Sequence, residues 1–414
     1  MKPNEMSSEG KNEERLPISA NLLIIFGTTL IAVMGVASIT PAFPRMSLEL
    51  GIPPGMISLV VIIFTIPGII LTPFLGIAAD RFGRRPVLVP SLLLFGVAGF
   101  SCMFSEPIGL ALGISPFLIL LCIRFVQGVG AAALGSLNIT IIGDLYRRQQ
   151  RAQVMGYNVS MQSTGTAIYP TLGGFLTLFG WFFPFYLPLL AIPIGLAALF
   201  KLEVPKPEDT LSIRQYFTQV GIVLRNRQVA GLFLVSTSVF IMLYGAIITY
   251  LPFLIITFFF VNSFIAGLVI SLISLAAAIV SPFMNKLAQR FSMKTVLLSA
   301  FPFMALGLFL VPFAPTLLLL LIPVAFFGIG MGFAMPTTWT LLVRLAPTEY
   351  RAALMSLNGL VLRLGQTLGP LIMAVVLGIW ALPGVYWVAA LVALVLIPII
   401  FVTIPSGSEL VKVH

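Results

Sequence analysis

The sequence predicts an all-α membrane protein whose twelve transmembrane helices form two pseudo-symmetric halves of six helices each. Of its 414 residues, 59% are hydrophobic and 9% are charged, whereas a soluble domain has roughly 25% charged residues. Apolar stretches of about 20 residues, the length that crosses a bilayer, recur along the whole chain. A charged turn occurs once in each half, as expected for a duplicated bundle. This composition excludes a soluble globular fold.

The apolar stretches define the expected helices. They cover residues 17–40, 53–75, 87–105, 114–142, 152–178, 182–201, 229–258, 262–284, 295–312, 316–343, 352–378 and 383–404. The first is too long for the apolar part of a signal peptide and further spans follow it, so we expect it to be retained.

The polar stretch at 203–228 separates two similar halves. We expect a tail at 1–16, a six-helix bundle at 17–202, the loop at 203–228, a second bundle at 229–404 and a tail at 405–414. At an offset of 200 residues the halves share polar, Gly and Pro residues in one register. The matched pairs are Gly128/Gly328, Gly130/Gly330, Thr140/Thr340, Arg151/Arg351, Ala152/Ala352, Met155/Met355, Asn158/Asn358, Gly165/Gly365 and Pro170/Pro370.

The Lys and Arg residues predict the orientation. Apart from Arg45, Arg124 and Arg363, they lie in the tails and the even-numbered connections. The positive-inside rule then places both termini in the cytoplasm. The net charge of +10 therefore reflects orientation in a plasma or inner membrane, rather than nucleic-acid binding.

Three motifs follow this pattern of spans. The first runs from Gly76 to Leu88, with a weaker copy at 285–294; the second covers 121–132 and the third 165–174. In these motifs the chain resembles major facilitator superfamily transporters, and more narrowly the twelve-helix drug:proton antiporters. The resemblance covers nearly the whole chain.

The first motif is expected to form a conformational latch. Its glycines permit close helix approach and a tight turn. The resemblance implies that Asp80 faces the start of helix 11, and that Arg84 pairs with Asp144 at the end of helix 4. The latch residues are Gly76, Asp80, Arg81, Gly83, Arg84 and Asp144. The alternative is that the arginines only set topology.

The third motif resembles the antiporter motif of helix 5. Gly165, Gly173 and Gly174 expose a face almost without side chains, and Pro170 bends the helix. We expect this face to seal the interface between the halves. Small residues that serve only packing are the alternative. Tyr169 replaces the Gly that usually precedes this Pro.

Arg124 and Arg363 lie inside predicted spans, where an Arg costs about 2.5–3.5 kcal/mol, so both are candidate functional residues. Polar neighbours lie one helical turn away or on the adjacent helix, and we expect a central substrate cavity lined from both halves. Its predicted residues are Arg124, Gln127, Asn158, Gln162, Tyr244, Tyr250, Trp339, Arg363 and Gln366. Met34 and Met242 would add apolar surface. The alternative is that both arginines donate to backbone carbonyls and amides and are structural.

All thirteen acidic residues can be placed outside the membrane core. If protons drive transport, Asp80 or Asp144 must carry them, or coupling is indirect through Arg124 and a water. Two embedded cations without an embedded anion also suit an anionic substrate.

The sequence and the resemblance together favour a secondary transporter that exports amphipathic small molecules in exchange for protons by alternating access. The alternatives are transport of an organic anion and lipid or glycolipid flipping. Without a nucleophile and base pair, a metal cluster or a P-loop, we expect no enzyme, cofactor or metal. The expected partners are a small-molecule substrate, protons and the bilayer, with the chain acting as a monomer.

Overall fold

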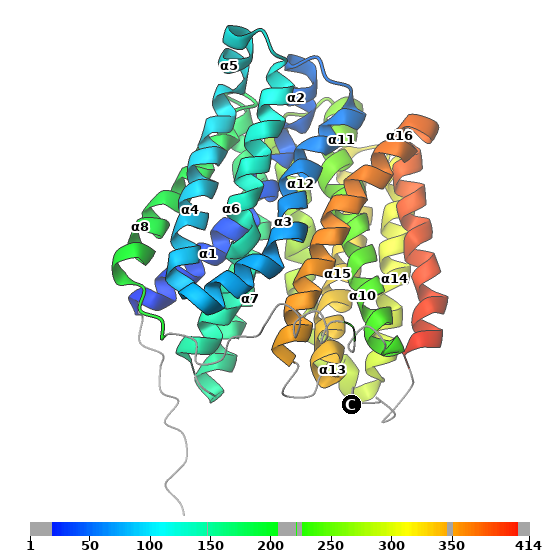
Figure 1. The fold of residues 1–414 in the computed structure, drawn as a ribbon. Coiled ribbons are helices and arrows are strands. Elements are labelled where there is room, and N and C mark those ends of the chain that lie inside the picture. Colours follow the sequence, from blue (N-terminus) through cyan, green and yellow to red (C-terminus); the bar gives the residue numbers. More distant parts are fainter. Residues whose placement is uncertain (1–18, 147, 206–220, 222–225, 346–350, 405–414) are drawn as a thin grey trace, which may run out of the picture.

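The computed structural model describes residues 19–146, 148–205, 221, 226–345 and 351–404. Two helical bundles stand side by side in Figure 1, with α1 to α8 in the first and α10 to α16 in the second. The predicted tails and most of the loop at 203–228 lie outside the described residues.

Most helices of the first bundle begin or end at Gly, Pro or Ser. Ser19 caps α1 by accepting from the Leu22 amide, Pro54 opens α3, and Gly83 separates α3 from α4 with a φ of 100°. The elements are α1 (Ala20–Ala37), η1 (Thr40–Ala42), α2 (Phe43–Glu49), α3 (Pro54–Phe82), α4 (Arg84–Ser101), η2 (Cys102–Phe104), α5 (Ser105–Leu112), α6 (Pro116–Leu145), α7 (Arg148–Thr177), η3 (Phe183–Leu190) and α8 (Ala191–Lys201).

The second bundle repeats this order. Its elements are α10 (Arg227–Ile241), the π-helix η4 (Met242–Tyr250), α11 (Leu251–Phe259), α12 (Ser263–Val280), α13 (Phe283–Arg290), α14 (Met293–Leu310), η5 (Val311–Phe313), α15 (Leu317–Leu345) and α16 (Arg351–Thr403). Asn226, Asn262 and Ser292 cap α10, α12 and α14.

The predicted spans are all present as helices, although their ends differ. Ten described stretches are long and apolar enough to cross a membrane. One of them, Leu357–Thr403, contains the last two predicted helices, which a kink at Trp380 and Ala381 divides. The predicted fifth span, α7, is not among them because its many Ser, Thr, Asn and Gln side chains lower its hydropathy. The first span continues past the predicted end at residue 40 through η1 and α2 to Glu49.

Charged residues mark the two ends of the bundles. The turn between α3 and α4, with Arg81, Arg84 and Arg85, and helix α13, with Lys286 and Arg290, lie at the same end of the two bundles, which we call the basic end (Figure 1). Arg45, Glu49 and Glu106 lie at the other, the far end, with α2 and α5. The structure therefore groups the basic connections on one face, as the sequence predicted.

Matched glycines make equivalent contacts in the two bundles, which supports a duplicated origin. In each matched pair, the two glycines contact equivalent helices, each within its own bundle. A Cβ would touch α3 at Gly128 and α12 at Gly328, α4 at Gly130 and α14 at Gly330, and α1 at Gly165 and α10 at Gly365.

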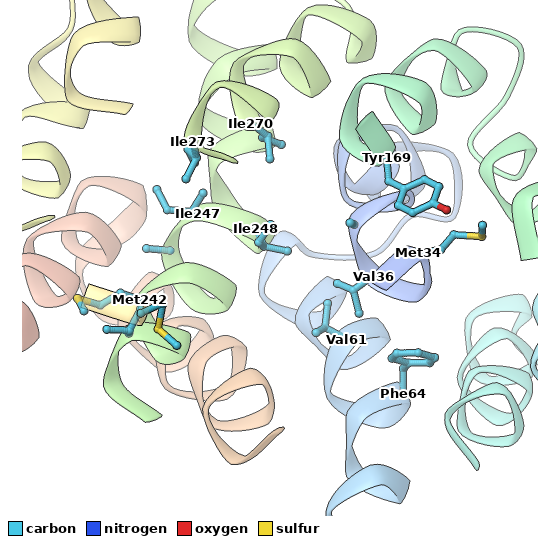
Figure 2. Packing of buried hydrophobic residues seen from close by; sticks show 14 of the residues in the cluster. Met34, Val36, Val61, Phe64, Tyr169, Met242, Ile247, Ile248, Ile270 and Ile273 are labelled. Carbon is cyan, nitrogen blue, oxygen red and sulfur yellow. The ribbon is translucent and has the colours of Figure 1, made fainter. Parts of the chain in front are cut away.

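The bundles meet mainly at the far end. There α7 packs along α12, α3 packs along α16, and η1 and α2 reach α11 and α12. The core cluster in Figure 2 draws apolar side chains from both bundles, among them Val36 and Val61 of the first and Ile248 and Ile270 of the second. The far end is therefore closed by apolar packing between the bundles.

The antiparallel pair α3 and α16 separates toward the basic end. Successive contacts along it join Gly55 to Ala374 and Leu377, Thr65 to Thr367, and Gly68 to Arg363. Among the described residues, no atom of another helix lies within 4 Å of a Cβ built at the next glycines in the same direction, Gly76 on α3 and Gly359 on α16. The two bundles thus touch at the far end and the middle and diverge at the basic end.

Candidate functional site

Arg124 is fully buried at 0% exposure and binds the end of another helix. Its Nη1 and Nη2 both donate to the Gly35 carbonyl at 3.0 Å, and Nε donates to the Val60 carbonyl at 3.3 Å. Gly35 lies in the last turn of α1, where carbonyls lack helical donors and favour a cation. Nη1 also donates to Gln127 at 2.6 Å, and the guanidinium lies 4.2 Å from the centre of the Phe64 ring. Arg124 therefore caps the C-terminal end of α1, where the first span passes from α1 into η1.

This placement bears on the predicted cavity. Gln127 is as buried as Arg124, at 0% exposure. Neither side chain is accessible in this conformation, so substrate contact by either stays a prediction, while the geometry supports the structural alternative. Met34 and Met242 are also fully buried, within the core cluster of Figure 2 rather than on an open wall.

Asn158 belongs to a buried triad that joins three helices of the first bundle. The Asn138 amide nitrogen on α6 donates to Asn158 Oδ1 on α7 at 3.2 Å, and Thr29 on α1 donates to the same oxygen. Asn138 also donates to the Ile25 carbonyl at 3.0 Å. The triad fixes α1, α6 and α7 to one another. The sequence analysis included Asn158 but missed Thr29 and Asn138.

In the second bundle, the three residues at the positions equivalent to this triad form different hydrogen bonds. The matched glycine contacts show that α10, α15 and α16 are equivalent to α1, α6 and α7. In this alignment Ser236 corresponds to Thr29, Thr338 to Asn138 and Asn358 to Asn158. Thr338 donates to Ala334 in its own helix, and among the described residues neither Asn358 Oδ1 nor Ser236 Oγ, both buried, has a hydrogen-bond partner. The triad is closed in one bundle and open in the other.

Arg363 lies between the two bundles. Its Nη2 donates to the Ala131 carbonyl of α6 at 3.0 Å, across the interface. Tyr244, at the start of the second bundle's π-helix, lies close to Arg363 and Gln366, and all three side chains are half-buried. The structure thus brings together three of the predicted cavity residues, and adds Gly68, Thr65 and Thr367 as neighbours that the sequence analysis did not name.

The remaining predicted cavity residues are dispersed. Gln162 is exposed on α7. Tyr250 is buried at 0% exposure, and its hydroxyl lacks a hydrogen-bond partner within the described chain. Trp339 on α15 is half-buried, with Nε1 unpartnered among the described residues. Their contact with a substrate remains a prediction.

The latch residues are paired within the first bundle. Arg84 Nε donates to Asp144 at 2.9 Å, the pairing that the resemblance implied, and Nη1 pairs with Asp80. Arg84 itself is only 7% exposed and joins α4 to α3 and α6. Arg81 stacks near Phe82, and Gly83 has the positive φ of the turn. Helix 11 begins α16 at Arg351, residues 346–350 before it lie outside the described residues, and the contact of Asp80 with this helix start stays a prediction.

The glycine face of α7 contacts both bundles. A Cβ on Gly173 would overlap the Ser38 carbonyl, and one on Gly174 would overlap the Ser263 carbonyl of α12. The Pro170 carbonyl lies against Gly267 of α12, and Gly165 packs on α1 and Tyr169. The motif therefore lies at the junction of the two bundles, close-packed at the far end.

Among the described residues, no group of three or more His, Cys, Asp or Glu side chains could hold a metal ion. The acidic residues in the described part of the chain lie at the ends of spans or in connections.

Two helical bundles that share one interface, with ten described stretches long and apolar enough to cross a membrane, are typical of membrane transporters. The sequence pattern of the Major Facilitator Superfamily matches residues 25–262 and 259–412, so the chain belongs to this family, whose members are transporters and not enzymes. The fold is similar to the crystal structure of a D-xylose-proton symporter, with a TM-score of 0.76 at 16% identity over 94% of this chain and 98% of that one.

Curated relatives include exporters. The chain is 23% identical to the bacillibactin exporter of Bacillus subtilis (strain 168) over 365 residues, which cover 86% of this chain and 89% of the exporter. It is 24% identical to the quinolone resistance protein NorA of Staphylococcus aureus over 204 residues, about half of each chain (49% and 50%).

Proposed function

We propose that this protein exports amphipathic small molecules across the plasma membrane in exchange for protons, by alternating access. The observation that carries the proposal is the closed far end combined with the divergence of α3 and α16 toward the basic end. With the basic end in the cytoplasm, as the positive-inside rule favours, this is the form that receives cargo from the cell interior. The bacillibactin exporter among its relatives supports the outward direction.

The latch supports the second half of the cycle. If α3 and α16 keep the register of the Gly68–Arg363 contact when they close, Asp80 would lie opposite the beginning of α16 at Arg351. When the bundles close at the basic end, Asp80 would meet the helix N-terminus, where a carboxylate gains about 0.3–1 kcal/mol. Arg84 holds Asp80 and Asp144 together until then.

Protons are the proposed coupling ion, and the latch carboxylates are the proposed carriers. Within the described residues, no Asp or Glu lies in the middle of a span, so Asp80 and Asp144 are the acids closest to the moving interface. Protonation of Asp80 would weaken its pairing with Arg84 and loosen the latch.

Transport by the purified protein in lipid vesicles tests the proposal. A membrane-impermeant aromatic dye that carries a carboxylate, such as carboxyfluorescein, should move across the membrane at a rate that follows an imposed pH gradient, and Asp144→Asn should slow it. Movement that follows only the membrane potential would contradict proton exchange. Scrambling of a labelled phospholipid without dye movement would favour the flippase alternative.

A further inference from the structure

We propose that Arg363 binds an anionic group of the cargo, a carboxylate attached to a flat apolar or aromatic body. This inference rests on the proposed function, since it names the class of molecule that the transporter carries. Arg363 lies where α16 of the second bundle faces α3 and α6 of the first, so a ligand held there contacts both moving parts.

Arg363 has free hydrogen-bond donors. A guanidinium carries five N–H donors. Within the described chain, Arg363 uses Nη2 alone, for the Ala131 carbonyl, while Nε and Nη1 have no hydrogen-bond partner. In Arg124, by contrast, all three nitrogens donate and the side chain is fully buried. One embedded arginine is therefore satisfied by the protein, and the other is half-buried and available.

Among the described residues, no acidic side chain pairs with Arg363. The ion pairs of the described residues are Arg45–Glu49, Arg84–Asp80 and Arg84–Asp144, all near the ends of the bundles. A cation held inside a membrane protein is stabilised by a partner of opposite charge. Since the planar guanidinium fork matches a carboxylate with two parallel hydrogen bonds, an anionic cargo would provide that partner.

Aromatic side chains beside Arg363 fit the rest of such a molecule. Tyr244 lies close to Arg363, and its ring stacks on Phe240 with centroids 5.6 Å apart and an interplanar angle of 17°. Both rings are half-buried, so part of their surface is accessible. A flat apolar body could pack against these rings while its carboxylate reaches the guanidinium.

A glycine fixes the position of the guanidinium. A Cβ on Gly68 of α3 would overlap Nη1 of Arg363 and lie 2.8 Å from its Cδ and Cζ. The arginine thus lies flat on the α3 backbone at Gly68, next to the hydrogen bond between Thr65 and Thr367 at 2.7 Å. Gly68→Ala would displace the guanidinium without removing its charge.

Binding of matched naphthalene probes to the purified full-length protein tests the proposal. We expect 2-naphthoate to bind saturably and its neutral amide, 2-naphthamide, to bind roughly ten- to hundredfold more weakly, because the amide lacks the charge-assisted pair. Arg363→Gln should reduce naphthoate binding to the level of the amide. Arg363→Lys should give an intermediate value, because it keeps the charge and loses the fork.

Arg344→Gln, on the exposed end of α15, is the matched arginine control and should leave naphthoate binding unchanged. Monodisperse elution establishes that each variant is folded; if Arg363→Gln aggregates, Gly68→Ala provides the same test and should weaken naphthoate several-fold. Equal binding of acid and amide to the wild type, or full naphthoate binding to a folded Arg363→Gln or Gly68→Ala variant, would overturn the proposal. In that case, dye transport driven by a pH gradient would still uphold the proposed function, and loss of dye transport with intact naphthoate binding would overturn the function alone.

Discussion

Arg124 and Arg363 show how two arginines inside membrane spans can have different roles. Arg124 donates to the Gly35 carbonyl at the C-terminal end of α1 and to Gln127, and its guanidinium packs on the Phe64 ring. Arg363 makes one hydrogen bond across the interface between the bundles. The difference lies in how many backbone acceptors the neighbouring helices offer, and it separates a structural cation from a candidate ligand-binding one.

Replacing Arg124 should therefore affect stability. Arg124→Gln removes the donors to Gly35 and Val60 and the charge at the end of α1, and hydrogen bonds in membrane proteins contribute about 0.6–2 kcal/mol each. We expect a clear decrease of the melting temperature in detergent. Arg344→Gln is the control on an exposed surface. An unchanged melting temperature for Arg124→Gln would show that the cap contributes nothing.

The sequence identified both arginines but could not distinguish their roles. The hydrogen bond from Arg124 to Gln127 agrees with their spacing of one turn and with the structural alternative of the sequence analysis. The Gly35 and Val60 carbonyls are backbone atoms of other helices, which no side-chain pattern reveals. Gly68 was missed for the same reason, because its importance comes from a side chain distant in sequence.

Among the helices, the buried triads are the clearest difference between the repeats. Thr29, Asn138 and Asn158 bind one another and join α1, α6 and α7. In the second bundle Thr338 occupies the position of Asn138, and its hydroxyl is turned to its own helix. Asn358 consequently lacks the donor that its counterpart receives.

Exchanging these residues tests whether the repeat geometry is equivalent. Thr338→Asn should supply a donor to Asn358 and raise the free energy of unfolding by roughly 0.5–1.5 kcal/mol. Asn138→Thr should remove the hydrogen bond from residue 138 to Asn158 and lower the free energy of unfolding by a similar amount. Thermal unfolding of both variants beside the wild type provides the measurement. A decrease in both variants would mean that the second bundle does not reproduce the spacing of the first.

Helix positions were largely predictable, whereas helix irregularities were not. Apolar length, charged turns and Asn, Ser, Gly or Pro residues at helix ends located every span. The break at Trp380 was also predicted, between the spans 352–378 and 383–404, whereas the continuation through α2 and the π-helix at Met242–Tyr250 were not. The triad threonine Thr29 gave no signal, because a single Thr in an apolar helix usually bonds its own backbone.

At the scale of the whole molecule, the two bundles form a pair that can pivot. Their contacts are close-packed at the far end, where Gly173 and Gly174 leave no space for a side chain. Toward the basic end, a Cβ built at Gly76 or Gly359 would have no atom of the described chain from another helix within 4 Å. Thr65 and Thr367 lie between these regions and are joined by a hydrogen bond of 2.7 Å. This pair marks the middle of the interface, about which the ends would alternately open and close.

Cysteine pairs across α3 and α16 can detect that motion. In a background lacking Cys102 and Cys122, Thr65→Cys with Thr367→Cys should cross-link readily, because the two side chains already touch. Gly76→Cys with Met355→Cys continues the same register but is separated in this structure. Its cross-linking therefore requires closure of the basic end.

We expect both pairs to form disulfides in vesicles, the second more slowly. Oxidation of the second pair should stop dye transport, and dithiothreitol should restore it. The slower rate reports how often the basic end closes, because the disulfide needs Cα atoms within about 7 Å. A pair at 76 and 355 that never cross-links, while the pair at 65 and 367 does, would show that the bundles do not close at the basic end. Alternating access through this interface would then be excluded, and the latch proposed for Asp80 with it.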